Sequence, residues 1–228
     1  MRKRAKRSGA KRSSPLRRIE LPSDLIDREP PPHQCEWIER FQHDIQAFQD
    51  RWDIADVVQY VAADFSLVAA TLRFITQHVP RPSGIENRFL EWGCGFGVIT
   101  LIAADQGFDA VGIETKEVLL DAGARTRDEL SLLSPMGQYV AGNFLPAGAE
   151  ALADYPTHPS LHHPVGDAYA KAGLDVDDFG IIYSYPWPGE NAFHRRVFET
   201  HAATGSVHVQ FVGPNDVQAW QKTGDGWI

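Results

Sequence analysis

The sequence predicts an α/β protein: a doubly wound, mostly parallel sheet of about five to six strands, with helices on both faces and an N-terminal helical cap. Short apolar runs alternate with helical stretches from residue 85 onward, which is typical of parallel β-α-β units. Three glycines follow the first apolar run, and the segment before residue 85 has apolar residues at helical spacing. We expect a basic, disordered tail and linker over 1–35, a helical cap over 36–84 and the sheet domain over 85–228.

The helical cap is predicted from one apolar face. Phe41, Ile45, Phe48 and Trp52 follow one another at steps of three and four residues, which places them on the same side of a helix. The helical pattern continues to residue 78, with a break expected near Asp64. Two prolines and a glycine in VPRPSG then end it.

The sheet domain is predicted from the alternation that follows. The expected strands cover residues 88–92, 109–114, 138–144, 179–186 and 206–213. The expected helices cover residues 97–107, 116–133, 167–174 and 190–202, and residues 216–222 are expected to form a last helical turn. Strands and helices in this order favour a sheet covered on both faces.

Composition favours one well-covered cytoplasmic domain. The chain has 228 residues, of which 43% are hydrophobic. Cys35 and Cys94 cannot make a disulfide framework, so we expect a reducing, cytoplasmic compartment. No apolar stretch approaches the roughly 20 residues that span a bilayer, and no apolar signal region follows the N-terminal charges. Neither membrane insertion nor secretion is therefore expected.

Charge separates the first 18 residues from the rest. They hold nine of the 22 Lys and Arg and no acid, which leaves 13 basic and 30 acidic residues elsewhere. Such a run is too polar to bury apolar surface and is expected to be disordered. It could be a solubility tail or a site for nucleic acid or another polyanion. A mitochondrial presequence is a weaker third reading, because the run lacks an apolar face.

The glycines at 93, 95 and 97 lie between the first strand and its helix, where such folds bind ligands. A dinucleotide fingerprint needs its third glycine at Val98, and no Walker lysine follows. Glu114 ends the second strand, where a carboxylate can accept both hydroxyls of a ribose. The spacing therefore favours a nucleoside-bearing ligand other than a dinucleotide.

Residues 88–213 resemble the core of class I S-adenosyl-L-methionine-dependent methyltransferases. The first motif of that family matches Glu91 to Gly97, and its second-strand acid matches Glu114. The third motif matches Gly142-Asn143, and the fourth matches SYPWPGE, residues 184–190. Within that family the chain resembles a bacterial subgroup whose fourth motif reads Tyr-Pro-Trp-Pro-Gly-Glu.

The resemblance implies S-adenosyl-L-methionine as cofactor. The glycine loop would carry the methionine part, the second-strand acid the ribose, and the third motif the adenine. The implied cofactor-binding residues are Glu91, Gly93, Cys94, Gly95, Gly97, Glu114, Asn143, Phe144 and Tyr183. The family usually has two more strands after the fifth, whereas only 15 residues follow Gly213.

The fourth motif is the candidate acceptor pocket, formed by Ser184, Tyr185 and Trp187. Methylases of planar amines usually have Asp or Asn, then two prolines and an aromatic residue, at this place. Serine accepts hydrogen bonds less well than Asp or Asn, and a tyrosine stands in place of one proline. Both differences weaken the prediction that the acceptor is a planar amine. The alternative is that both rings only pack against the cap. Phe96, Tyr183 or Tyr185 could stabilise a sulfonium by cation–π attraction.

The segment 145–166 is long for a strand-to-helix connection and could cover the site. Its His158, His162 and His163 raise the possibility of a metal, but no cysteine or well-spaced acid completes a set. We expect an ordinary exposed loop and no metal. By position alone, the candidates for a general base are Asp64, Glu190 and His194.

The sequence therefore predicts a methyltransferase whose acceptor is an amine or hydroxyl of a small molecule, protein or nucleic acid. Two alternatives remain open. One is a non-catalytic cofactor-binding module recruited by its basic tail. The other is an aminopropyl-type transferase that uses a related cofactor, although the acidic fourth-strand signature of those enzymes is missing here.

Overall fold

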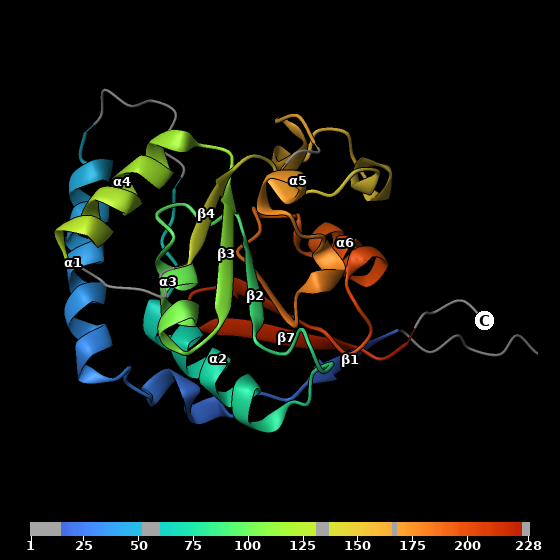
Figure 1. Cartoon of the computed structure of the whole chain (residues 1–228), viewed down its shortest axis with the longest axis horizontal. Helices are drawn as coiled ribbons and strands as arrows, with labels where there is room; N and C mark the ends of the chain where they lie inside the picture. The colour runs from blue at the N-terminus through green and yellow to red at the C-terminus, as the bar shows by residue number, and fades with distance from the viewer. Residues whose placement is uncertain (1–14, 52–59, 131–136, 166–167, 225–228) are drawn as a thin grey trace, which may run out of the picture.

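A seven-stranded sheet runs through the middle of the computed structural model, which describes residues 15–51, 60–130, 137–165 and 168–224 (Figure 1). The strand order is β1-β7-β6-β5-β2-β3-β4. Strands β2 to β6 pair in parallel, whereas β7 pairs antiparallel with β6, and β1 antiparallel with β7. The predicted doubly wound, mostly parallel sheet is confirmed, with more strands than the expected five to six.

The strands are β1 (Leu16–Ile19), β2 (Arg88–Trp92), β3 (Asp109–Glu114), β4 (Gln138–Ala141), β5 (Ile181–Ser184), β6 (Val207–Gly213) and β7 (Asp216–Lys222). The helices are α1 (Pro32–Gln49), α2 (Phe65–His78), α3 (Val98–Asp105), α4 (Glu117–Glu129), α5 (Ala168–Ala172) and α6 (Asn191–His201). Short 3-10 turns cover Ser23–Asp27, Ala149–Leu152, Pro159–Leu161 and Val176–Asp178.

The prediction of a helical turn over residues 216–222 is wrong, because this segment is strand β7. Asn215 takes a left-handed conformation, with φ of 62°, and the chain reverses there onto β6. Ala219 then lies opposite Val209 of β6 and is completely buried. The backbone bonds that β6 offers decide the conformation of a segment whose own pattern is ambiguous.

The prediction of a disordered tail and linker over residues 1–35 is wrong from Leu16 onward. Strand β1 pairs with β7 along its length, from Leu16 opposite Lys222 to Ile19 opposite Ala219. A 3-10 turn follows, and α1 begins at Pro32. Residues 1–14, which carry most of the predicted basic tail, lie outside the described residues. The two strands beyond the five predicted ones are β7, which follows β6, and β1, which comes from the N-terminal segment.

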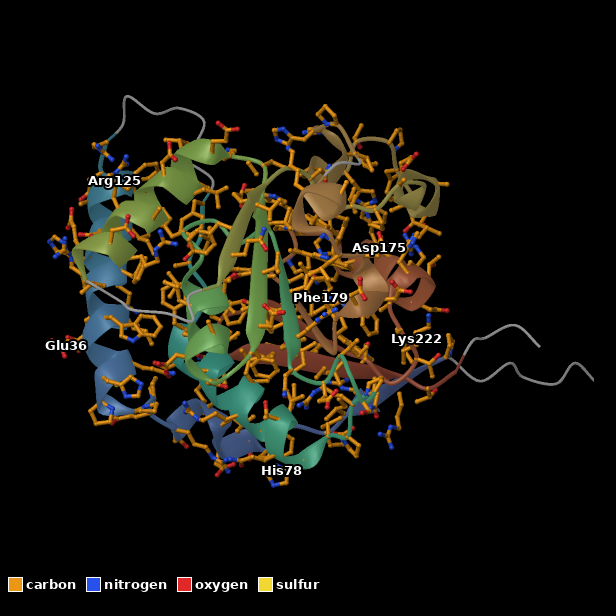
Figure 2. The ribbon with its side chains drawn as sticks, in the orientation of Figure 1. Glu36, His78, Arg125, Asp175, Phe179 and Lys222 are labelled. Carbon is orange, nitrogen blue, oxygen red and sulfur yellow. The ribbon has the colours of Figure 1, made fainter. Side chains whose placement is uncertain are left out.

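The sheet separates two apolar layers (Figure 1). Helices α1 to α4 cover one face, which carries Phe89 and Glu91 of β2. Helices α5 and α6 cover the other face, which carries Leu90 and Trp92. In Figure 2, Phe179 lies in the interior, whereas Glu36 and Arg125 lie on the outside. The alternation of side chains along the central strands therefore decides which layer each residue meets.

The predicted cap is a layer of this fold. Phe41, Ile45 and Phe48 are buried along one face of α1 as expected, and Trp52 lies outside the described residues. The expected break near Asp64 is confirmed, because Asp64 caps α2 and its carboxylate accepts a hydrogen bond from the Leu67 N–H at 2.9 Å. None of the helices described in the structure is both long and apolar enough to cross a bilayer.

Candidate functional site

The glycine loop connects β2 to α3 at the carboxyl end of the parallel strands. Gly93, Gly95 and Gly97 have φ angles of 74°, 54° and 73°. Residues that carry a side chain rarely adopt this left-handed backbone conformation. This explains why glycine stands at every second position of the loop. The loop is as tight as the sequence predicted at this place, and of its three glycines only Gly93 is exposed.

Glu91 fastens the helix that follows the loop. One oxygen of its carboxylate accepts hydrogen bonds from the Thr100 N–H at 2.7 Å and from the Thr100 hydroxyl at 2.6 Å. Thr100 lies in the first turn of α3, whose free N–H groups and positive dipole end favour an acceptor. Burial nevertheless raises the pKa of Glu91 to about 8, although the Thr100 bonds lower it. Near neutral pH this carboxyl group is therefore largely protonated.

Glu114 joins the loop to the end of β3. Its carboxylate accepts hydrogen bonds from the Gly95 N–H at 2.9 Å and from the Lys116 N–H at 3.0 Å, and the Thr115 hydroxyl donates to it at 3.2 Å. Two carboxylate oxygens have about four acceptor positions. Glu114 thus keeps capacity for one more donor, which suits a hydroxyl of a bound ribose.

Helix α4 approaches the loop through a glycine that sequence reasoning did not single out. A Cβ at Gly123 would lie 2.1 Å from the Phe96 carbonyl oxygen. On β3, a Cβ at Gly112 would lie 2.9 Å from the Cys94 side chain. Burial raises the pKa of the Cys94 thiol well above its ordinary value. Cys94 is thus buried against Gly112 of β3. A glycine inside a helical pattern was the only sequence signal for the contact between the loop and α4.

Two tyrosines cover the glycines, and sequence reasoning missed both. The Tyr60 ring lies over Gly95, where a Cβ would be 2.3 Å from its Cε2 atom, and packs against Phe96 at 5.4 Å between ring centroids. The Tyr139 ring lies over Gly97 and its hydroxyl donates to the Gly97 carbonyl at 3.2 Å. A ligand that approaches Gly95 must therefore meet or displace the Tyr60 ring.

Tyr183 and Tyr185 lie on the same face as Glu91. Tyr183 stands opposite Glu91 in the pairing of β5 with β2, and Tyr185 packs edge-on against Phe211 at 4.7 Å. The Tyr183 hydroxyl is buried and has no hydrogen-bond partner among the described residues. Trp187, beyond the strand, is 39% exposed. The structure thus gathers Tyr183 and Tyr185 on one face and leaves Trp187 at the surface.

Ser184 differs from its predicted place in an acceptor pocket. It points to the opposite face from Tyr183 and Tyr185, because neighbouring strand residues alternate. Its side chain is completely buried, and Ser184 Oγ lies 3.0 Å from Nε2 of the equally buried His208. The structure gives Ser184 a partner inside the core.

Asn143 and Phe144, which the resemblance placed against an adenine, also have internal partners. The Asn143 amide donates to the Ser160 carbonyl at 2.8 Å and to the His163 carbonyl at 3.0 Å. The Phe144 ring stacks on Trp92, with centroids 5.2 Å apart and planes at 19°. Asn143 therefore holds the segment that follows β4 against the end of that strand.

Glu190 anchors the same segment from the fourth motif. Its carboxylate accepts hydrogen bonds from the Ser160 N–H at 3.0 Å and the Ser160 hydroxyl at 2.8 Å. Burial alone would raise the pKa of Glu190, but bonds from His194 and Ser160 leave it below its ordinary value. Burial lowers the pKa of His194, which faces the same carboxylate at 3.7 Å. Both groups belong to an internal anchor and not to an open site.

The prediction that the histidines of segment 145–166 are exposed holds for His162 and His163 but is wrong for His158. His158 is buried, stacks on Phe193 with ring centroids 5.0 Å apart, and lies 3.5 Å from a Glu190 oxygen. The charge of Glu190 and the apolar wall of α6 draw this histidine inward. Among the residues that the structure places, no three His, Cys, Asp or Glu side chains form a group that could hold a metal ion.

Known structures resemble the chain only weakly. An RNA methyltransferase from Salinibacter ruber, crystallised with S-adenosyl-L-homocysteine, is 16% identical, with 72% of this chain and 94% of that one covered and a TM-score of 0.47. A Podospora anserina methyltransferase bound to the same molecule is 13% identical (82% and 65% covered, TM-score 0.44). A methyltransferase from Thiobacillus denitrificans with that molecule is also 13% identical (70% and 54% covered, TM-score 0.41).

This chain spans less than two thirds of the length of the last two proteins. The sequence matches no protein-family model and no curated protein.

Glu91 generates a prediction for the pH dependence of stability. The folded state holds its proton up to a pKa of about 8, whereas the ordinary value is 4.5. Between these values the folded state binds more protons than the unfolded state, so the free energy of unfolding falls as pH rises. Glu91→Gln can still accept from Thr100 and should flatten this fall in urea unfolding between about pH 5 and 9. Glu117→Gln, at an exposed site, is the control, and an unchanged slope in Glu91→Gln would contradict the prediction.

Gly123 generates a prediction about whether an alanine stabilises or destabilises the protein. Helix propensity alone makes Ala more stable than Gly by about 1 kcal/mol. At Gly123 the new methyl group would meet the Phe96 carbonyl at 2.1 Å, so Gly123→Ala should instead lower the midpoint of urea unfolding. Ala124→Gly, at the next position of α4, should show only the propensity cost. A Gly123→Ala protein that is more stable than the parent would show that the loop yields freely to the helix.

Proposed function

We propose that the chain is an S-adenosyl-L-methionine-dependent methyltransferase. The observation that carries the proposal is the glycine loop in its setting: three left-handed glycines between β2 and α3, tied through the Gly95 N–H to Glu114 of the adjacent strand. A dinucleotide site needs a glycine where this chain has Val98, which is buried at the start of α3. The loop and its carboxylate thus suit a single nucleoside with a short charged extension.

Different residues would bind the different parts of the cofactor. The loop backbone at Gly93, where a Cβ would meet nothing within 4 Å, leaves room for the methionine part. Glu114 offers its remaining acceptor position to the ribose. At the adenine end, Asn143 would have to exchange its bonds to Ser160 and His163 for bonds to the base. Adenine and segment 145–165 then compete for the same amide.

When bound, the cofactor supplies a methyl carbon that its sulfonium already activates. The chain must hold an acceptor in line with that carbon and keep water away, because alignment supplies much of the rate. Tyr183 and Tyr185 lie in the same layer as the glycine loop. Their rings can stabilise a sulfonium by cation–π attraction, which contributes on the order of 1 kcal/mol. Tyr185 and the exposed Trp187 are the proposed walls for the acceptor.

The three residues that were candidates for a general base have other contacts. Asp64 caps α2, and Glu190 and His194 belong to the anchor at Ser160. The proposed reaction therefore rests on positioning, and the acceptor's proton is not assigned to any of them.

Glu114 provides the test of cofactor binding. Loss of a charge-assisted hydrogen bond costs about 1.5–3 kcal/mol, so Glu114→Gln should weaken binding of S-adenosyl-L-homocysteine by about 10- to 150-fold. Calorimetry measures this, with Glu117→Gln as the exposed control and urea unfolding as the check on folding. Unchanged affinity in a folded Glu114→Gln protein, or preferential binding of NAD by the parent, would overturn the assignment.

Tyr185 provides the test of catalysis. Tyr185→Ala and Trp187→Ala should leave cofactor affinity within a few-fold but sharply reduce transfer of a labelled methyl group into a cell extract, because the acceptor loses its alignment. Tyr155→Ala, at a side chain that is 66% exposed on segment 145–165, is the control. Cofactor binding without any methyl transfer would favour a binding module, and transfer of another part of a related cofactor would favour an aminopropyl-type enzyme. Turnover that falls only with the folded fraction would remove both rings from the acceptor pocket.

A further inference from the structure

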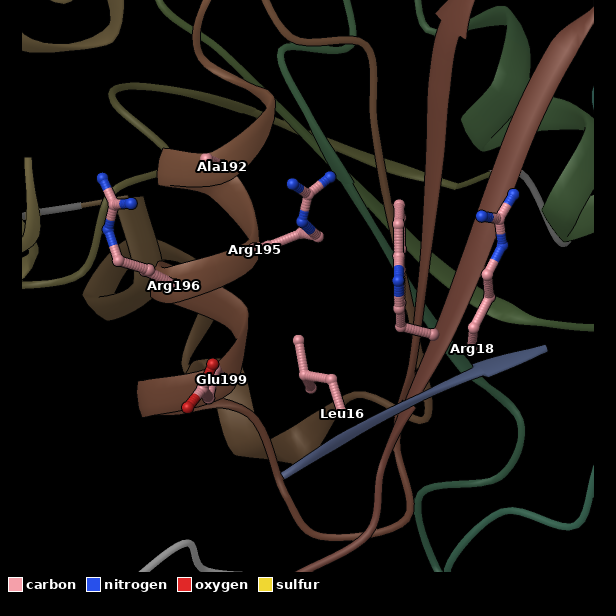
Figure 3. A pocket seen from close by; sticks show the side chains of 7 residues that line it. Leu16, Arg18, Ala192, Arg195, Arg196 and Glu199 are labelled. Carbon is pink, nitrogen blue, oxygen red and sulfur yellow. The ribbon is translucent and has the colours of Figure 1, made fainter. Parts of the chain in front are cut away.

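A hollow of about 320 Å³ lies between the N-terminal edge of the sheet and helix α6 (Figure 3). No residue of the glycine loop lines it. Strands β1 and β7 form one wall, and α6 forms the other. The lining residues are Leu16, Arg18, Ala192, Arg195, Arg196, Glu199 and Trp220.

Three arginines line this hollow, and Figure 3 shows that they point in different directions: Arg195 extends from α6 toward the strands, Arg18 stands on the strand wall, and Arg196 extends from α6 away from the strands. Arg195 lies over the Trp220 ring, 4.8 Å from its centroid, and donates to Gln210 at 3.2 Å. Arg196 donates to Asp154 at 2.6 Å, so its charge already has a partner. The Arg18 side chain is exposed and makes no hydrogen bond or ion pair with the residues that the structure describes. Arg18 and Arg195 are therefore the two cations available to a ligand.

The position of Arg18 follows from the pairing of β1. Arg18 stands opposite Trp220 in the register of β1 with β7, so its side chain and the indole belong to the same face of the sheet. Arg17 points to the other face, where it donates to Gln221 at 2.5 Å. Arg17 and Arg18 therefore lie on opposite faces of the sheet, and only Arg18 lines the hollow.

Two adjacent arginines on α6 are unusual in a part of the chain that is strongly acidic overall. Outside residues 1–18, 13 basic residues face 30 acidic ones, yet Arg195 and Arg196 are neighbours on α6. Burial and the charge of Arg196 both lower the pKa of Arg195. A bound anion would relieve this repulsion. Planar guanidinium groups match phosphate oxygens in pairs, which favours a phosphate as that anion.

We propose that this hollow binds one nucleotide unit of a single-stranded nucleic acid. Arg18 and Arg195 contact its phosphate, and the base lies against the apolar wall of Trp220 and Leu16. Glu199 accepts a hydrogen bond from a base amino group or a sugar hydroxyl. Proteins that bind single strands combine cations with an aromatic ring in this way, and the volume lies at the lower end of ligand pockets, about 300–1,000 Å³.

A single strand suits the geometry better than the alternatives. The indole lines a hollow between two elements, so only an unstacked base can reach it. A phosphopeptide would use the arginines but has no general need of the aromatic wall. The seven Lys and Arg of residues 1–14 precede β1 in the sequence, although they lie outside the described residues and form no part of the proposed site.

The test measures binding of a fluorescein-labelled oligouridylate of about 12 nucleotides to the full chain by anisotropy. Loss of one phosphate contact should weaken binding about five-fold at about 0.1 M salt and reduce the salt slope by about 0.7. We expect this for Arg18→Gln and for Arg195→Gln. Arg17→Gln, one residue away on the opposite face, is the matched control and should change neither quantity as much.

The ring has its own test. Trp220→Leu should weaken binding by about 5- to 150-fold with an unchanged salt slope, because stacking of one base is lost. Trp220→Phe keeps a ring and should retain most of the affinity, and this result separates stacking from a loss of folding. Affinity for S-adenosyl-L-homocysteine should stay unchanged in the arginine variants, since the proposed cofactor site is elsewhere.

Four outcomes would overturn the proposal. One is an Arg18→Gln effect equal to that of Arg17→Gln, and another is no binding by the parent chain. A third is a full-length variant with glutamine for the seven Lys and Arg of residues 1–14 that loses all binding, while the arginine and Trp220 variants bind normally. The fourth is binding of a phosphopeptide or inorganic phosphate to the Arg18 and Arg195 pair without binding of the oligonucleotide.

Discussion

The rest of the site depends on the capping of helix α3 by Glu91. Glu91, on the strand before the glycine loop, accepts two hydrogen bonds from Thr100 in the first turn of the helix after it. These bonds join the element before the loop to the element after it. Glu114 then holds the middle of the loop through the Gly95 N–H. Two buried acidic side chains from adjacent strands therefore fix a loop in which every second residue is a glycine.

The close approach of the neighbouring elements follows from that constraint. A fixed loop lets α4 pack against the Phe96 carbonyl at Gly123 and lets Tyr60 and Tyr139 lie on the glycines. The energetic cost falls on Glu91, whose burial favours the protonated form. A site of this kind combines a rigid backbone with aromatic side chains over it, and the aromatic side chains are the part that a ligand can move.

The fourth motif contributes to both layers of the molecule. Tyr183 and Tyr185 join the layer of the glycine loop, whereas Ser184 meets His208 in the layer of α6. Glu190 then binds Ser160 and so ties segment 145–165 to the start of α6. Asn143 holds the same segment from the end of β4. The end of β5 and the fourth motif after it thus place the two tyrosines in the layer of the loop and fix segment 145–165.

The sequence by itself determined the alternation of strands and helices, the glycine loop and the carboxylate of Glu114, because local periodicity and spacing report them directly. Only the tertiary structure decided the rest. Residues 216–222 form a strand because β6 offers them bonds, and Leu16–Ile19 joins the sheet through a partner some 200 residues away. The places of Tyr60, Ser184 and His158 were likewise set by neighbours distant in sequence. A pattern shows which way a side chain faces on its own element, but the partner it meets depends on how the elements pack.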